Sequence, residues 1–168
     1  MKKPKIEIRP PKMSDLNSLL EMINSLVDEK AFITVQKKLT YKEEKEYLKK
    51  IIKDKNSIHL FLLIDGKVVG NSMVAIGNKD EKHIGEIGIS LKKEARGMGL
   101  GEKLFKEVIN KAIKKFKLRI LSLGVHGKNK IAQNLYKKMG FEILGTIKGG
   151  VNHYNKYEDL IKMVKYLK

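Results

Sequence analysis

Three glycines alternate in the stretch RGMGLGE (96–102), directly before a run of apolar residues at helical spacing. The first N–H groups of a helix have no partner inside the helix, and together with the helix dipole they attract an anion. Glycines let the backbone approach such a ligand, because no Cβ stands in the way. Arg96 adds a charge-assisted contact. The stretch therefore predicts a phosphate or pyrophosphate site.

Two familiar phosphate motifs do not fit this stretch. The dinucleotide fingerprint G-x-G-x-x-G needs a third glycine later than Gly101 and an acidic residue at the end of the next strand, which RILSLGV (119–125) lacks. The P-loop needs Lys-Ser or Lys-Thr after its last glycine, and neither follows here. The ligand is therefore expected to be neither a dinucleotide nor a nucleoside triphosphate.

A second group of informative residues lies in 129–141. Asn129 stands where a helix N-cap belongs, and Gly140 is placed to end the same helix. Between them, Tyr136 carries a phenol of ordinary pKa about 10, which can donate a proton. The chain has no cysteine, which excludes a thiolate nucleophile and a disulfide framework. Its four histidines form no metal-binding set by their spacing.

Hydrophobic periodicity places these residues on a series of elements. A helix is expected after Ser14 and another after a Thr40/Glu43 capping box, the latter with Tyr47, Leu48, Ile51 and Ile52 inward. Asp65-Gly66 predicts a hairpin turn. The remaining helices are expected over 99–116 and 130–139, and strands over 5–9, 58–64, 67–76, 83–91, 118–125, 141–147 and 157–167. This order indicates one mixed α/β domain spanning residues 1–168.

The glycine stretch and the second segment together resemble the signatures of the GNAT superfamily, the acyl-CoA-dependent N-acetyltransferases. Residues 96–101 resemble Q/R-x-x-G-x-G/A, and residues 129–141 resemble N-x-x-A-x-x-L-Y-x-K-x-G-F. The strand 86–91 and the tail 157–167 are also similar to family strands, so the likeness covers 58–167 well and the N-terminal helices loosely. It implies a three-layer α/β/α fold around a central mixed, mostly antiparallel, splayed sheet.

The resemblance also implies a reaction, in which an amine attacks the thioester of acetyl-CoA directly. Tyr136 would be the general acid for the departing thiolate, because its ordinary pKa of about 10 nearly matches the value of about 8.5 for a thiol. Backbone N–H groups near Leu91 would stabilise the oxyanion that forms when the amine attacks. Residues 89–91 would pair with pantetheine, the glycine stretch would hold the pyrophosphate, and Asn129 and Lys138 would touch the CoA arm. The implied cofactor-binding residues are Ile89, Ser90, Leu91, Arg96, Gly97, Met98, Gly99, Leu100, Gly101, Glu102, Asn129 and Lys138.

The general base is where the sequence departs from the family. Some relatives that act on protein N-termini have a glutamate at the position of Gly124. Glu86, acting through water, and His126, on the same strand face as Gly124, are the available substitutes, and we expect Glu86 to be the base. The acceptor groove is expected between the N-terminal helices and a 147–157 loop. Protein N-termini, lysines, small amines and polyamines all remain open as acceptors.

The charge of the chain indicates a preference for anionic partners. Net charge is +17, and all but three of the 36 basic residues are lysine. Base-reading interfaces favour arginine and stacking aromatics, so nucleic acid is not the expected partner. The alternative is a non-catalytic CoA-binding or nucleic-acid-associated module. No apolar run could cross a bilayer and MKKPKIEIRP has no leader-like apolar core, so a cytoplasmic monomer or homodimer without a membrane partner is expected.

Overall fold

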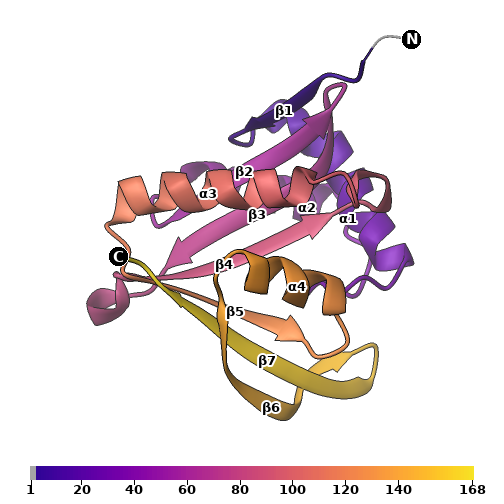
Figure 1. The fold of residues 1–168 in the computed structure, drawn as a ribbon. Helices are drawn as coiled ribbons and strands as arrows, with labels where there is room; N and C mark the ends of the chain where they lie inside the picture. Colours follow the sequence, from indigo (N-terminus) through magenta and orange to yellow (C-terminus); the bar gives the residue numbers. More distant parts are fainter. Residues whose placement is uncertain (1–2) are drawn as a thin grey trace.

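The computed structural model describes residues 3–168; Met1 and Lys2, at the start of the segment tested for a leader, lie outside this range. The strands are β1 (Ile6–Arg9), β2 (Ser57–Ile64), β3 (Lys67–Ile76), β4 (Ile84–Leu91), β5 (Ile120–His126), β6 (Glu142–His153) and β7 (Lys156–Tyr166). The helices are α1 (Leu16–Asp28), α2 (Tyr41–Lys53), α3 (Leu100–Phe116) and α4 (Lys130–Lys138). All seven strands join one sheet in the order β1-β2-β3-β4-β5-β7-β6 (Figure 1).

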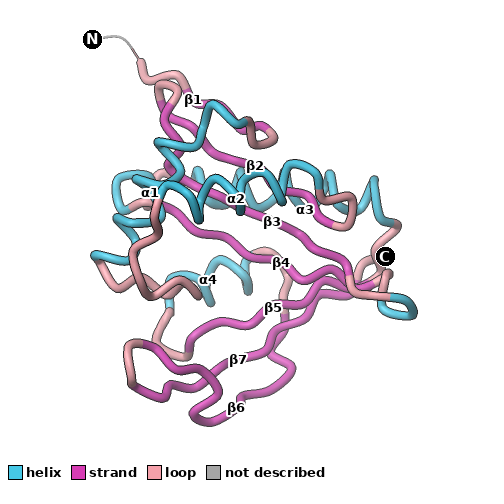
Figure 2. The backbone as a smooth tube through the Cα atoms, turned by 180° about the vertical axis from the view of Figure 1, so that it is seen from behind, coloured by secondary structure: helices cyan, strands magenta, loops and turns pink. Residues whose placement is uncertain are grey.

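Helices cover both faces of this sheet. α3 and α4 lie on one face, where Leu104, Phe105 and Val108 pack against strand residues in the larger core. α1 and α2 lie on the other face over β2 and β3, with Leu19, Met22 and Leu48 fully buried (Figure 2). The predicted three-layer α/β/α fold is confirmed. No helix within residues 3–168 combines the length and the apolar character needed to span a membrane.

The sheet divides between β4 and β5. These strands run parallel, and they pair only along Ile84–Glu86 of β4 and Ile120–Ser122 of β5. Beyond this seam, β4 continues to Leu91 on β3 alone, and β5 continues to His126 on β7 alone. The other neighbouring strands pair antiparallel, so the mixed, mostly antiparallel, splayed sheet is also confirmed.

Local signals in the sequence fix several boundaries correctly. Asp65 and Gly66 have φ of 48° and 78°. A two-residue hairpin turn needs such positive values to match the right-handed twist of the strands that it joins. At the start of α2, the Thr40 hydroxyl accepts from the amide of Glu43, whose carboxylate accepts from the amide of Thr40. This is the predicted capping box.

The predicted 147–157 loop is wrong, because β6 continues through it to His153. Pairing with β7 resumes at Val151 after an irregularity that takes up 148–150, and the connection is reduced to Tyr154 and Asn155, with φ of 50° and 63°. Bulges let a strand absorb residues that do not alternate. The polar, glycine-rich composition of this segment therefore suggests a loop where the structure has an edge strand.

Two predictions about the N-terminal helices also fail. Ser14 lies in a short 3-10 turn and does not cap α1, whose N-cap is Asp15. The Asp15 carboxylate is buried and receives two hydrogen bonds from Arg9, at 2.7 and 2.8 Å. In α2, Tyr47 and Ile52 are each 41% exposed, because only one narrow stripe of the helix faces the sheet.

His59 on β2 is buried under α2, and burial lowers its pKa to about 4. The unfolded chain takes up this proton near pH 6.5, so His59 stabilises the fold fully above that pH and loses its contribution as the pH falls towards 4. We expect the pH change from 7.5 to 4.5 to cost about 3 kcal/mol of unfolding free energy through this residue. Urea unfolding of the wild type and His59→Leu at both pH values measures the difference.

The exposed His83 supplies the control, since His83→Leu should leave the pH dependence of the wild type unchanged. Glu44, a buried residue of α2 itself, has a pKa raised by burial and therefore contributes with the opposite sign. It is present in every variant, so the comparison isolates His59. Equal pH slopes for the wild type and His59→Leu would show that His59 does not carry the effect.

Candidate active site

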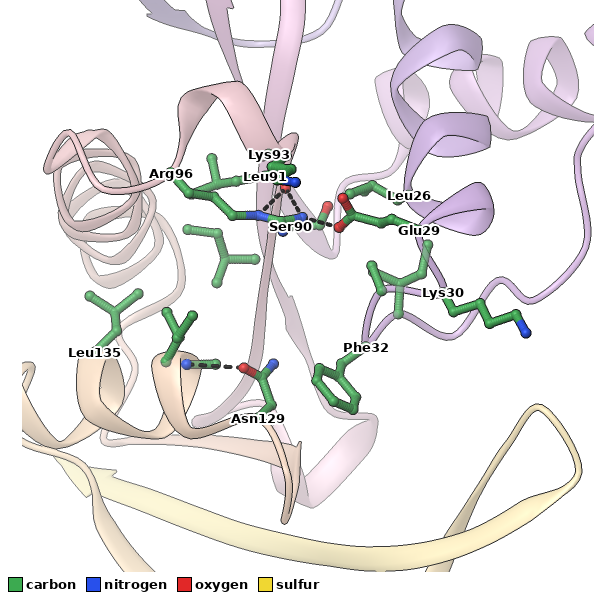
Figure 3. Close-up of a pocket in the computed structure, with 15 residues that line it drawn as sticks. Leu26, Glu29, Lys30, Phe32, Ser90, Leu91, Lys93, Arg96, Asn129 and Leu135 are labelled. Carbon is green, nitrogen blue, oxygen red and sulfur yellow. Dashed lines mark hydrogen bonds and ion pairs between the residues drawn. The ribbon is translucent and has the colours of Figure 1, made fainter.

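A cleft of about 460 Å³ lies where the sheet divides. Its walls are the end of β4, the segment 29–33 that follows α1, and the start of α4 (Figure 3). Of the residues predicted to bind a cofactor, Ile89, Ser90, Leu91, Arg96 and Asn129 line it. The structure thus brings the strand end, the segment before α3 and the start of α4 to one place, although 38 positions separate Leu91 from Asn129 in the sequence.

The glycine stretch forms the first turn of α3, as predicted. Gly99 is the N-cap and has φ of 71°, a left-handed conformation that favours glycine. The amide of Lys103 bonds to the carbonyl of Gly99, so the amides before it lie in the part of the turn that has no intrahelical acceptor. A Cβ on Gly101 would lie 2.7 Å from Leu91, which shows how closely this turn packs on β4. The arrangement is suited to an anion.

Arg96 is engaged with protein atoms. Its guanidinium donates to the carbonyl of Leu91, at 2.7 and 3.0 Å, and pairs with Glu29 at the end of α1 (Figure 3). Arg96 therefore braces β4 against α1 across the mouth of the cleft. A phosphate contact from Arg96 would require it to share or exchange these partners.

Glu102 and Lys138 form a second link beside the glycine stretch. The Glu102 carboxylate, in the first turn of α3, lies 2.7 Å from Lys106 and 2.6 Å from Lys138. The hydrogen bonds from Lys106 and Lys138 lower the pKa of Glu102 to about 2. The two lysines neutralise Glu102, the one carboxylate in this otherwise anion-attracting turn. Through Lys138, the start of α3 is joined to the end of α4.

Asn129 and Tyr136 lie on α4, with Asn129 as its N-cap, accepting from the amide of Ala132 at 3.2 Å. Tyr136 is 6% exposed and packs between Phe105 and Phe141, with ring centroids 5.4 and 6.1 Å away. Burial raises the pKa of Tyr136 to about 12. The near match to a thiol is therefore wrong for the free protein, and the phenol is better suited to donating a hydrogen bond than to giving up its proton early.

Glu86 and Gly124 lie on the sheet face opposite α4. Leu121, Leu123 and Val125 of β5 point into the α3/α4 core, so the alternate residues of β5 point to the other face. Glu86 is exposed and stands opposite Ser122 across the seam. Gly124 pairs with Lys162 of β7, and a Cβ on Gly124 would lie 3.6 Å from the Lys162 ammonium. A cation thus lies beside Gly124 on the sheet face opposite α4.

A cluster that the sequence did not predict lies at the far end of the same face. His126 Nδ1 is 3.5 Å from a Glu158 oxygen, and His153 brings a ligand atom within 4.8 Å of both. Lys128 donates to Glu158 at 2.8 Å, which is the main reason that the pKa of Glu158 is lowered. The phenyl ring of Phe32 packs on both imidazoles, with centroids 5.0 and 5.2 Å away. Sequence spacing could not reveal the cluster, because three different strands supply it.

Comparison with known proteins identifies the family of this arrangement. A model of the acetyltransferase (GNAT) family matches residues 20–141, well over half of the chain. The chain is 29% identical over 107 residues to an L-amino acid N-acetyltransferase of Escherichia coli. That match covers 63% of this chain and just under two thirds, 66%, of the relative.

Solved structures agree with the fold over nearly the whole chain. An acetyltransferase of the GNAT family from Streptococcus pneumoniae superposes with a TM-score of 0.86 at 29% identity, covering 97% of this chain and 100% of that one. A phosphinothricin acetyltransferase from Sinorhizobium meliloti, solved in complex with acetyl-CoA, has a TM-score of 0.84 at 22% identity, with 96% and 88% of the two chains covered. At 22% identity, the likeness to the Sinorhizobium meliloti structure shows only that the two proteins share a fold.

Proposed function

Because this chain belongs to the acetyltransferase (GNAT) family, we propose that it transfers an acetyl group from acetyl-CoA to an amine by direct attack on the thioester. The observation that carries this proposal is the cleft beyond the β4–β5 seam, which is lined by the end of β4, by Arg96 and by the N-cap of α4. The first turn of α3 packs on the same strand end, at Leu91. The anion-attracting helix start supports a pyrophosphate seat, and the unpaired edge of β4 supports pairing with pantetheine amides.

The proposed cosubstrate seat uses the residues that the sequence predicts. Residues 89–91 would bind the pantetheine arm, and residues 96–102 would hold the pyrophosphate on backbone N–H groups. Asn129 and Lys138 would contact the arm or its phosphates, with Lys138 exchanging Glu102 for a phosphate oxygen. The net charge of +17 favours the approach of so anionic a ligand.

In the proposed reaction, the acid and the base act from opposite faces of the sheet. The amine loses a proton to Glu86 through water and attacks the carbonyl carbon, while β4 amides stabilise the oxyanion. As the C–S bond breaks, the Tyr136 hydroxyl donates a hydrogen bond to the sulfur and then its proton. We favour Glu86 over His126 because His126 is committed to Glu158 and is covered by Phe32.

We propose that the acceptor is a small amine carrying a carboxylate, such as a free amino acid. Glu86 and Lys162 are both exposed on the same face as Gly124, beside which the Lys162 ammonium and the Leu160 side chain lie. A carboxylate would pair with Lys162 while the amine faces Glu86. The E. coli relative, named as an L-amino acid N-acetyltransferase, supports this acceptor class. Polyamines fit poorly, because Lys162 would repel them.

A thiol-release assay with acetyl-CoA tests both proposals. Free amino acids and their amides form the matched substrates, because the amide keeps the amine and loses the carboxylate. We expect kcat/KM to be about 10- to 100-fold higher for the free acid, which is the value of one hydrogen-bonded ion pair. Lys162→Met should abolish this preference, and Glu86→Gln should lower kcat for acid and amide alike.

The outcomes separate the two levels of the proposal. Equal turnover of acid and amide by the wild type would remove the carboxylate-bearing acceptor and leave the transferase activity standing. The alternative of a non-catalytic module would instead be supported by acetyl-CoA binding without thiol release from any amine, amino acid or peptide. A polyamine as the best acceptor would also contradict the role given to Lys162.

A further inference from the structure

The cluster of His126, His153 and Glu158 lies on the β5–β7–β6 part of the sheet, outside the proposed cofactor seat. His126 ends β5, His153 ends β6, and Glu158 lies near the start of β7. Register places them together, because Leu160 pairs with His126 and Val151 pairs with Glu158, so all three side chains share one face. Their ligand atoms all lie within 4.8 Å of one another.

We propose that His126, His153 and Glu158 bind a divalent transition-metal ion, with Zn²⁺ as the best-fitting ion. Two imidazoles and one carboxylate form a donor set that suits zinc and similar first-row metals and is poor for Mg²⁺. Around a tetrahedral zinc ion, neighbouring ligand atoms stand about 3.3 Å apart, given metal–ligand distances of about 2.0–2.2 Å. His126 Nδ1 and Glu158 Oε2 already stand 3.5 Å apart.

Neighbouring groups orient His153 and Glu158 through hydrogen bonds, as is usual for metal ligands. His153 Nε2 lies 3.1 Å from the carbonyl of Ala31, and donation there leaves the lone pair of Nδ1 available. The second oxygen of Glu158 accepts from Lys128 at 2.8 Å, which orients the carboxylate and leaves Oε2 facing His126. Glu158 and His126 side chains are 7% and 12% exposed, so bulk water competes little for these groups.

A bound ion would link the acceptor side of the molecule to the segment that follows α1. Phe32 packs on both imidazoles and also lines the cleft at the seam. Gln36 ties the same segment to the hairpin turn through Asn152 and Tyr154. The metal would therefore fix three strand ends beneath the wall of the acceptor groove, where it contributes order and not a reacting group.

Metal binding is measured on untagged, chelator-treated protein by calorimetry and by competition with a chromophoric chelator. We expect one Zn²⁺ per chain, and Mg²⁺ should bind far more weakly. His126→Gln and His153→Gln should each weaken Zn²⁺ binding at least about tenfold. Loss of a group that only orients a metal ligand already costs about that much, and loss of the ligand itself should cost no less. Zn²⁺ should raise the melting temperature of the wild type in proportion to its saturation.

His83→Gln, at an exposed histidine away from the cluster, is the matched control and should bind Zn²⁺ like the wild type. Glutamine keeps an amide that can donate to Ala31, so metal-free melting of His153→Gln reports whether the fold is intact. Equal Zn²⁺ affinity in the wild type, His126→Gln and His153→Gln would overturn the proposal. Absence of saturable binding to the wild type, or a preference for Mg²⁺, would overturn it as well.

Discussion

Tyr136→Phe is expected to lower kcat about 100-fold while the KM for acetyl-CoA changes less than about twofold. A positioned proton donor contributes about 10²- to 10⁴-fold, and the low end applies because burial raises the pKa of Tyr136 to about 12. The ring would stay packed between Phe105 and Phe141, so the variant loses one oxygen and no core volume. Steady-state kinetics with a melting curve makes the measurement.

The control for Tyr136→Phe is Tyr157→Phe, at a tyrosine that is 78% exposed on β7. That variant should keep the wild-type kcat, which shows that loss of a phenol as such has no effect. Unchanged kcat in Tyr136→Phe would remove the proton-donor role. A large rise in KM for acetyl-CoA with unchanged kcat would assign the hydroxyl to cofactor binding instead.

Gly99→Asn is expected to weaken acetyl-CoA binding at least about tenfold, or about 1.4 kcal/mol, with little loss of stability. Asparagine tolerates the left-handed conformation that Gly99 adopts, with φ of 71°. No heavy atom lies within 4 Å of a Cβ placed there, so the fold accepts the side chain. The new side chain would instead fill the space in front of the turn, where the pyrophosphate is proposed to bind. Titration calorimetry gives the affinity.

Gly66→Asn matches this change in every respect but location. Gly66 has φ of 78° and equally open surroundings, and it lies in the β2–β3 hairpin turn. The Gly66→Asn variant should bind acetyl-CoA like the wild type and show a melting temperature close to that of Gly99→Asn. If both variants bind acetyl-CoA equally well, the pyrophosphate does not sit on this turn.

The predictable parts of the fold are those governed by neighbours in sequence. The Thr40 capping box and the Asn129 N-cap follow from side chains that bond within three residues, and both are present. The Asp65-Gly66 turn follows from the positive φ that these two residue types accept, and it is present as well. The start of α3 follows in the same way from Gly99. Chemistry that a short stretch completes alone, such as an anion-attracting helix start, is therefore visible in the sequence.

What could not be predicted depends on partners far away in the chain. Arg96 was expected to face a phosphate, and nothing near it in sequence points to Glu29 as its partner, 67 residues away. Lys162 meets Gly124 only because of the β5–β7 register, and the histidine cluster depends on β6 extending through a segment that composition marks as a loop. Strand register sets the Lys162 contact and the histidine cluster, and the residue types alone do not determine that register. The Arg96–Glu29 pair depends on how α1 packs beside the end of β4.

The short seam between β4 and β5 joins the two parts of the sheet at one end only. Three residue pairs connect the four-stranded part to the three-stranded part, and the buried residues under α3 supply most of the remaining adhesion. A ligand lying in the cleft would touch β4 of the four-stranded part and, on the other side, Asn129 and α4, which follow β5 of the three-stranded part. A ligand bound in the cleft would then hold the two parts of the sheet together. Local opening of the β5–β7–β6 part would be slower in the ligand-bound protein than in the free protein.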